Sequence, residues 1–271
     1  MPTCSVIPHM KYAIIALGCA GMLTSCTSLP RPEITSETKN QPGALQLVRE
    51  SSQQAGNPYQ RLSRVDVCYD GEWANLATRI QPVVTDPEFR KVSDESYFPK
   101  QLKVRQVYRG TGGEKIVTRT GKSITVTRNG KRIADQEELD AAALVADCYV
   151  VFTFGSSALL ERGSGWRSVG KRKLGGESCT LVAGTVRPGF GNSEADAVIV
   201  WIGDESKRLH RVQLTLLGLA STAGADVDVS FNNFQPGPFG TEWPRAFDER
   251  IRRPFDIPAH VWRMEELKAR R

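Results

Sequence analysis

Two stretches of regular alternation constrain the fold of this 271-residue chain more than any other feature. In residues 210–216 and 225–231, a histidine or an apolar side chain alternates with a polar one, such as Arg211, Asp226 or Asp228. Successive side chains of a strand point to opposite faces of a sheet, so this period of two predicts strands with one covered face. Such strands are typical of antiparallel sheets. We therefore expect Asp226 and Asp228 to lie on a solvated face.

Further strands are indicated along much of the chain. Residues 195–202 are almost uniformly apolar, which predicts a central strand covered on both faces. Asn129-Gly130 favours a two-residue hairpin turn, because both residues tolerate a positive φ. Shorter runs with the composition of strands complete the set: 65–69, 102–109, 115–120, 123–128, 166–174 and 178–186.

One long helix is predicted in the middle of the chain, at residues 136–154. Asp135 and Glu138 match a capping box, and the Ala-rich run that follows contains no proline. The end of this run, from Cys148, is β-branched and aromatic, so it is compatible with a strand as well. Shorter helical stretches are indicated at two further places: 44–54 and 73–80.

Many antiparallel strands and one central helix define the expected fold class. We predict an α+β fold in which a large curved antiparallel β-sheet, a half-barrel, carries helices packed on its concave face. A closed barrel is the alternative. The expected organisation is a signal peptide at 1–25, a lipidated flexible tether at 26–43 and a single β-rich domain at 44–271.

The first 25 residues have the features of an export signal. A lysine precedes an apolar run at 12–23, which is shorter than the roughly 20 apolar residues that a membrane-spanning helix needs. Leu23-Thr24-Ser25-Cys26 is similar to the lipobox of bacterial lipoproteins. That resemblance implies cleavage between Ser25 and Cys26, with diacylglycerol and palmitate attached to Cys26. An ordinary secretory signal followed by a chance cysteine is the alternative.

The residues after the predicted lipid attachment site bear on location. By the same resemblance, Thr27 favours anchoring in the outer membrane, facing the periplasm, because an aspartate at this position favours the inner membrane. Residues 27–43 are rich in Ser, Thr, Pro and Asn, which is typical of a flexible tether. Basic clusters at 171–173, 250–253 and 268–271 either attract anionic lipid or form a solvated face. Nucleic acid is a poor partner for a periplasmic protein, despite a net charge of +6.

Three cysteines remain for the folded domain once the signal and the lipidated residue are set aside: Cys68, Cys148 and Cys179. In an oxidising compartment one pair forms a disulfide, or all three stay as thiols. The sequence does not choose between these alternatives.

The sequence motifs of enzymes are incomplete. Gly121-Lys122-Ser123 lacks the first glycine of a phosphate-binding loop, and Gly176-Glu177-Ser178-Cys179-Thr180 lacks the closing glycine of a nucleophile elbow. We expect His210 to be a hydrogen-bonded core or pocket residue and His260 to be a packing residue, although either remains a candidate base. No ligand spacing for a metal is present. We therefore expect no catalytic residue, metal or cofactor.

A hairpin and the strand after it resemble one protein family. Residues 195–212 are similar to a hairpin of the LolA/LolB-type lipoprotein carriers and outer-membrane lipoprotein-sorting proteins, in which a strand ending in Trp-Ile-Asp precedes a turn and an arginine-containing strand. Here the strand ends Trp201-Ile202-Gly203, with glycine in place of aspartate. Later features are similar to the next strand and turn of the family: Phe231-Asn232-Asn233-Phe234, Gly240 and Trp243-Pro244.

The resemblance implies a half-barrel with a helical lid around an apolar groove that holds acyl chains. We expect an outer-membrane-anchored periplasmic lipoprotein that binds lipid or lipoprotein acyl chains, for transport or envelope maintenance. An envelope scaffold without a small ligand and a hydrolase of envelope material are the alternatives. Six inward-facing residues either contact the ligand or serve only as core: Val198, Val200, Val212, Leu214, Val227 and Val229.

Overall fold

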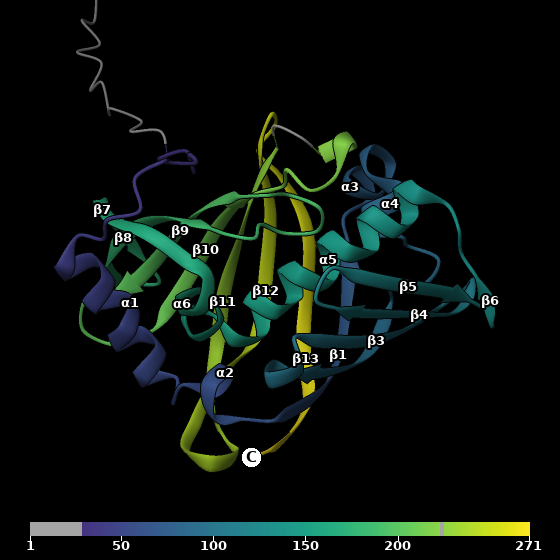
Figure 1. Cartoon of the computed structure of the whole chain (residues 1–271), viewed down its shortest axis with the longest axis horizontal. Helices are drawn as coiled ribbons and strands as arrows, with labels where there is room; N and C mark the ends of the chain where they lie inside the picture. The colour runs from purple at the N-terminus through teal and green to yellow at the C-terminus, as the bar shows by residue number, and fades with distance from the viewer. Residues whose placement is uncertain (1–28, 223–224) are drawn as a thin grey trace, which may run out of the picture. The chain divides into compact units, whose positions relative to one another are not determined.

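Thirteen strands form a single antiparallel sheet in the computed structural model, which describes residues 29–222 and 225–271 (Figure 1). The strands are β1 (Arg64–Trp73), β2 (Val92–Phe98), β3 (Lys103–Gly110), β4 (Gly113–Thr120), β5 (Ser123–Arg128), β6 (Lys131–Arg132), β7 (Gly163–Leu174), β8 (Glu177–Val186), β9 (Asp196–Gly203), β10 (Leu209–Thr215), β11 (Asp226–Gly237), β12 (Thr241–Arg253) and β13 (Ile257–Arg270). The predicted signal peptide, with Ser25 and Cys26, lies outside the described residues.

The strand order is β6-β5-β4-β3-β2-β1-β13-β12-β11-β10-β9-β8-β7. From β1 to β6 and from β7 to β13, strands that follow one another in sequence pair side by side. The two series are connected where β1 pairs with β13. β6 and β7 are the two edges, so the sheet is open. The predicted half-barrel is confirmed, and the closed barrel was wrong.

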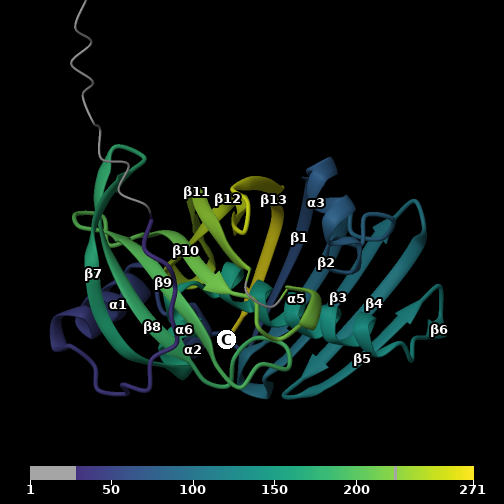
Figure 2. The same ribbon diagram turned by 90° about the horizontal axis from the view of Figure 1, so that it is seen from above.

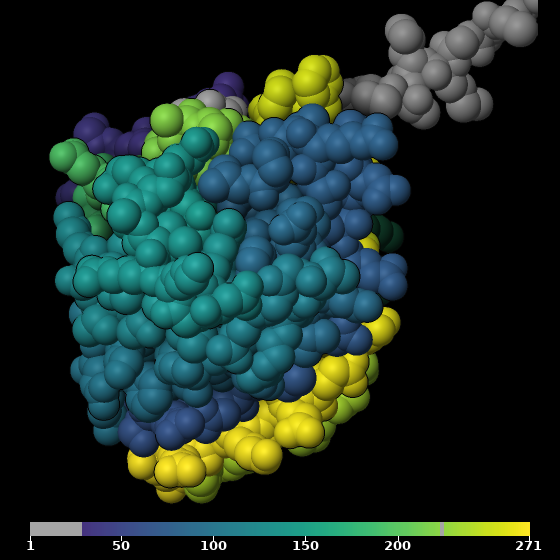
Figure 3. Space-filling model, turned by 90° about the vertical axis from the view of Figure 1, so that its right-hand side faces the viewer, coloured from purple at the N-terminus to yellow at the C-terminus, as the bar shows by residue number. Residues whose placement is uncertain are grey.

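Two halves of the sheet curve toward each other, as Figure 2 shows. We call β1–β6 the first arm and β7–β11 the second arm; β12 and β13 form the seam between them. Figure 3 shows the outer surface around the first arm, in blue and teal, with the C-terminal strands in yellow along its lower edge. The helices are α1 (Pro42–Gln54), α2 (Pro58–Arg61), α3 (Asn75–Ile80), α4 (Pro82–Thr85), α5 (Gln136–Phe154) and α6 (Ser156–Arg162), with 3-10 turns η1 (Pro99–Gln101), η2 (Ala220–Thr222) and η3 (Pro238–Gly240).

The long helix α5 lies between the arms on the concave side of the sheet (Figure 2). Its first turn is capped as predicted, because the Asp135 carboxylate accepts a hydrogen bond of 2.9 Å from the backbone N–H of Glu138. The helix continues to Phe154, so the strand alternative for its last turns was wrong. Gly155 then turns the chain at φ +55, a conformation that disfavours other residues. Most side chains of α5 are buried, since the curved sheet surrounds it.

Strands with proline or many charges were not predicted. The strand runs expected from the sequence include none of the segments that form β2, β12 and β13. Pro244 and Pro258 lie within these strands, and proline ordinarily argues against a central strand. By contrast, the doubly covered strand predicted at 195–202 is confirmed as β9, in which every residue is buried.

Asp226 and Asp228 are buried, contrary to the solvated face that their alternation predicted. The Asp226 carboxylate accepts a hydrogen bond from Arg253, and the Asp228 carboxylate accepts one from Arg252. Arg211 of β10 lies 3.4 Å from the same Asp228 oxygen. The alternation assigned the strand correctly, but long arginine side chains from the neighbouring strands cover this face of it.

The segment ahead of α1 lies along the outer edge of β7. The backbone N–H of Gln41 donates to the carbonyl of Trp166 at 2.7 Å. The side chains of Asn40 and Gln41 accept hydrogen bonds of 3.0 Å from the backbone N–H groups of Trp166 and Ser168. Part of the segment predicted as a tether therefore covers a strand edge that would otherwise be open to pairing.

The three cysteines of the folded region, Cys68, Cys148 and Cys179, are free thiols, as one of the two alternatives expected. Burial raises the pKa of the Cys148 thiol well above its usual value. Within residues 29–222 and 225–271, no helix combines the length and the apolar character needed to cross a membrane.

Candidate ligand-binding site

A groove with a volume of about 770 Å³ opens between the two arms. One wall is formed by the turns before β3 and between β4 and β5 of the first arm. The opposite wall is formed by the end of α6 and the loop between β8 and β9. The last turns of α5 form the floor, and α2 closes one end.

The floor and adjoining walls of the groove are largely apolar. Val150 and Phe154 of α5 face it, together with Tyr97 and Val104 of the first arm. Phe154 is fixed by edge-on contacts with other rings, at centroid distances of 5.2 Å to Tyr59 and 5.6 Å to Tyr97. An apolar surface in a concave site favours apolar parts of a ligand.

A buried ion pair connects the walls at one place. Arg119 of β4 donates to the Asp147 carboxylate of α5 at 3.1 Å and to the carbonyl of Gly191, in the loop after β8, at 2.8 Å. The same Asp147 oxygen accepts the backbone N–H of Gly191 at 2.8 Å. Burial raises the pKa of Asp147, and the Arg119 guanidinium opposes that rise. These contacts hold the β8–β9 loop against α5 and the first arm, which fixes the width of the groove there.

Positive charges outnumber negative ones in the groove lining. The carboxylates are Asp147 and Glu161, while six cationic side chains line the same space: Lys100, Lys103, Arg119, Lys122, Arg162 and Arg187. The lining therefore carries a net charge of +4, six minus two.

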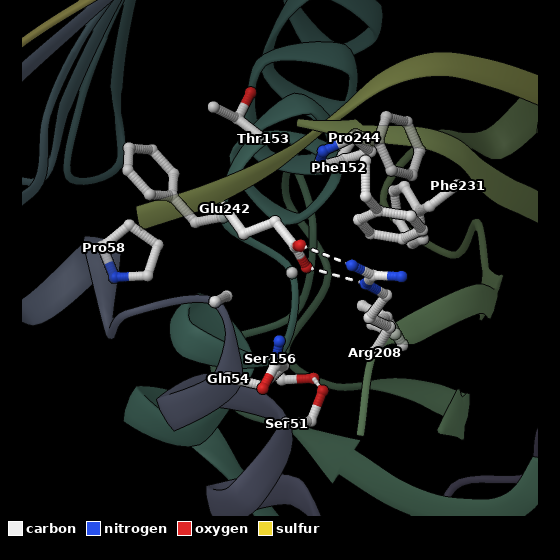
Figure 4. A pocket seen from close by; sticks show the side chains of 15 residues that line it. Ser51, Gln54, Pro58, Phe152, Thr153, Ser156, Arg208, Phe231, Glu242 and Pro244 are labelled. Carbon is white, nitrogen blue, oxygen red and sulfur yellow. Dashed lines mark hydrogen bonds and ion pairs between the residues drawn. The ribbon is translucent and has the colours of Figure 1, made fainter. Parts of the chain in front are cut away.

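A second, smaller cavity of about 40 Å³ lies on the other side of Phe154, whose side chain borders both spaces. Figure 4 shows Phe152, Phe231 and Pro244 around it, with Arg208 facing Glu242. The Arg208 guanidinium donates two hydrogen bonds to the Glu242 carboxylate, at 2.6 and 2.8 Å. This volume suffices for a few water molecules but not for a ligand.

The six predicted ligand contacts lie together on the concave face of the second arm, on β9, β10 and β11. All are at most 2% exposed, and none lines the groove. They belong to the main core, in which the side chains of α5 and α6 cover them. A ligand role for them stays a prediction, and it requires α5 to move away from the sheet. The residues concerned are Val198, Val200, Val212, Leu214, Val227 and Val229.

The groove residues were missed by the sequence analysis. The one local signal is the run Lys100-Gln101-Leu102-Lys103, in which an apolar residue lies among lysines beside a proline turn. Leu102 is 63% exposed and has a φ of +49, a conformation that is rare for leucine. Nothing in the sequence connects this run to α6 or to the β8–β9 loop.

His210 lies in a cluster whose geometry differs from that of a hydrolase triad. Its Nε2 atom lies 3.0 Å from Glu177 and 3.3 Å from the Ser206 hydroxyl. In a triad, the serine and the acid contact different nitrogens of the ring. Here the Ser206 hydroxyl donates to Glu177 at 2.9 Å, and Glu177 also accepts backbone N–H groups of the β9–β10 turn. These hydrogen bonds hold the pKa of Glu177 at about 2, although burial opposes the shift, and they stabilise the turn.

His260 is a packing residue, as predicted from the sequence. Its ring stacks on Trp73 at 3.9 Å and on Trp262 at 4.7 Å between centroids. Burial, with Arg90 nearby, lowers the pKa of His260 well below its usual value, so the imidazole is neutral near pH 7. Across the described ranges, no group of three or more His, Cys, Asp or Glu side chains has the arrangement of a metal site.

No protein-family model and no curated protein matches the sequence. Among solved structures, this chain is similar to a LolA superfamily protein from Nitrosomonas europaea, with a TM-score of 0.47, 10% identity, and coverage of 84% of this chain and 94% of that one. It is also similar to an outer membrane lipoprotein-sorting protein domain from Vibrio parahaemolyticus, with a TM-score of 0.49, 8% identity, and coverage of 83% and 91%. For the lipoprotein LppX of Mycobacterium tuberculosis the values are 0.29, 19%, 65% and 90%. At these identities the likeness concerns the fold alone.

Proposed function

We propose that this protein binds an acyl chain of a lipid or lipoprotein in the groove between the arms, for transport or for maintenance of the cell envelope. The observation that carries this proposal is the groove itself, which has a volume of about 770 Å³ and an apolar floor. Pockets for small organic ligands have volumes of roughly 300–1,000 Å³ and mostly apolar linings. A flexible chain of methylene groups matches an apolar floor, which is formed here by side chains such as Val150 and Phe154.

The proposal includes a membrane anchor at Cys26. The lipobox-like run Leu23-Thr24-Ser25-Cys26 supports lipid attachment there, and Thr27 supports the outer membrane. More than one acyl chain on the cysteine would give stable anchoring, where a single chain gives marginal binding. A domain held at a membrane surface in this way would meet acyl chains at high local concentration.

The six core residues of the second arm are a second part of the proposal. A longer chain would reach Val200, Val212 and their neighbours only if α5 moved outward as a lid. Gly155, at the joint between α5 and α6, has a backbone conformation that other residues rarely adopt, and it is the natural hinge for such a movement. In the closed arrangement described here the chain would occupy the outer groove.

Native mass spectrometry of the protein purified from lipid-containing cells tests the proposal, together with titration by dansyl-labelled undecanoic acid. We expect a co-purifying lipid and saturable binding of the probe. Val150→Glu places a charge on the groove floor and should weaken probe binding by at least about tenfold. Val261→Glu is the matched control, because Val261 is half exposed and lies outside the groove lining.

Circular dichroism would establish that both variants are folded before binding is compared. A folded wild-type protein that carries no lipid and does not take up the probe would contradict the proposal. Equal binding by the two glutamate variants would contradict the assignment of the groove as the site.

A further inference from the structure

The mouth of the groove carries an excess of positive charge that the fold does not neutralise. We propose that it binds the anionic headgroup, a phosphate or carboxylate, of the amphiphile whose chain lies on the groove floor. This inference rests on the proposed function and adds the class of ligand: an anionic amphiphile rather than a neutral or cationic one.

Five of the six cationic side chains in the lining have no ion-pair partner among the described residues: Lys100, Lys103, Lys122, Arg162 and Arg187. Arg119 is different, because it pairs with Asp147 and holds the walls together. Glu161, the other carboxylate of the lining, accepts a hydrogen bond from Gln60. The charge that remains is therefore available to a ligand.

The unpaired cations occupy both walls. Lys100, Lys103 and Lys122 lie on two turns of the first arm, which are joined by a hydrogen bond of 3.0 Å from the Gly121 N–H to the Leu102 carbonyl. On the opposite wall, the Arg162 guanidinium lies over a phenylalanine ring, 5.2 Å from its centroid. A headgroup between these walls would be approached by cations from two sides, while exposed Leu102 adds apolar surface at the entrance.

Some basic residues outside the groove are neutralised by carboxylates. Arg252 of β12 pairs with Asp228 and Asp256, and Lys171 of β7 pairs with Asp204 at 2.8 Å. Both belong to basic clusters that the sequence analysis considered for anionic lipid. The groove differs from such paired positions, because its unpaired cations converge on one concave space from two walls, which makes it the better site for an anion.

Phosphate and carboxylate oxygens are the groups that lysine and arginine bind best, through charge-assisted hydrogen bonds. Attraction at such a partly exposed site weakens as salt screens the charges. Binding of an anionic amphiphile should therefore depend on salt, and binding of an uncharged analogue should not.

The test compares dansyl-labelled undecanoic acid with its methyl ester, which has the same chain and no charge. We expect the acid to bind at least about tenfold more tightly than the ester at low salt. Lys100→Gln/Lys122→Gln, two exposed positions on one wall, should remove most of this preference, measured as the ratio of acid to ester affinity. Arg162→Gln should act in the same direction from the opposite wall. Arg263→Gln/Lys268→Gln is the control, with the same loss of charge at exposed positions outside the groove lining.

Each outcome separates this inference from the proposed function. Equal binding of acid and ester, unaffected by the groove variants, would overturn the headgroup site and leave acyl binding intact. Failure of both probes to bind would overturn the proposed function as well. If inorganic phosphate competes with the labelled acid as strongly as dodecyl phosphate does, the groove is a site for small anions. This result would overturn the inference that the ligand is an anionic amphiphile. Stronger competition by vesicles of phosphatidylglycerol than by dodecanoate would assign the headgroup to a phospholipid, and the reverse order would assign it to a fatty acid.

Discussion

The two arms of the sheet bury different chemistry. The inward side chains of β9 and β10 in the second arm are aliphatic, and Val200 and Leu214 have no measurable exposure. The first arm buries ions against α5 as well. Lys115 of β4 pairs with Asp86 and lies 3.7 Å from Glu138 of α5. Toward α5, the second arm thus presents an aliphatic core, whereas the first arm is held to this helix by ion pairs as well as by apolar contacts.

This difference explains where the groove lies. Aliphatic side chains in the second arm pack against α5 and α6 and are fully or almost fully buried. Buried ion pairs in the first arm contribute little net stability, but they fix positions, because breaking one leaves an uncompensated charge. The first arm therefore places its turns, with Leu102 and its lysines, at a defined distance from the second arm.

The largest expected effect tests whether the second arm is a filled core. Leu214→Ala should lower the free energy of unfolding by about 4 kcal/mol, because it removes buried methyl groups and leaves a cavity. Leu102→Ala in the first arm should change it by less than about 0.5 kcal/mol, since Leu102 is exposed. Urea denaturation measures both. If Leu214→Ala lowers the free energy of unfolding by less than about 1 kcal/mol, the second arm is not a filled core and has room for a ligand. The difference between the two arms described above would then be wrong.

A smaller effect is expected from a broken ion pair in the first arm. Asp86→Asn keeps the shape of the side chain and tolerates the φ of +43, but it removes the charge opposite Lys115. We expect a loss of about 3 kcal/mol in the free energy of unfolding.

The double variant Asp86→Asn/Lys115→Met serves as the control, because it also removes the stranded ammonium group. It should recover at least half of the lost stability in the same denaturation experiment. If the double variant is less stable than Asp86→Asn alone, the charges stabilise the arm through contacts other than this pair.

The smallest effect concerns Glu249 of β12, at the seam between the arms. Burial raises the pKa of Glu249 from 4.5 to about 7, and Arg90 opposes the rise. Because the pKa of Glu249 is higher in the folded state than in the unfolded state, its contribution to the free energy of unfolding depends on pH. This contribution is fully present below pH 4.5 and is lost as the pH rises through about 7. Glu249→Gln should therefore be more stable than the wild type by about 2 kcal/mol at about pH 8, and similar to it at about pH 4.

Thermal or urea unfolding at the two pH values measures this difference. Glu266→Gln is the control, because it makes the same substitution at a side chain that is 69% exposed. A stability difference for Glu249→Gln that does not change with pH would exclude a raised pKa for Glu249 in the folded protein.

Local patterns predicted much of the fold. The alternation in β10 and β11, the apolar run of β9 and the cap of α5 at Asp135 all lie within a few residues of what they specify. The strands that were missed, β2, β12 and β13, contain charges or prolines, so they lack the local pattern of a strand, and β13 also pairs with a strand that lies far away in the sequence. β13 is an example, because its partner β1 lies near the other end of the chain.

The candidate site was less predictable than the fold. Val200 and Val212 were correctly expected to face inward, but whether they contact a ligand or only α5 depends on how far the helix enters the sheet. The burial of Asp228 depended on arginines from β10 and β12 in the same way. The cations of the groove come from both halves of the chain, and no spacing in the sequence unites them.

By itself, then, the sequence determined the strand and helix periods, the antiparallel class of the sheet and the lipobox-like run that ends at Cys26. These depend on residues within a few positions of one another, because side-chain direction repeats every two residues in a strand and every 3.6 in a helix. Only the tertiary structure decided which inward face is filled, which acids are neutralised and where the groove opens. Those properties depend on which distant side chains meet, as Arg119 of β4 meets Asp147 of α5 and Gly191 of the β8–β9 loop.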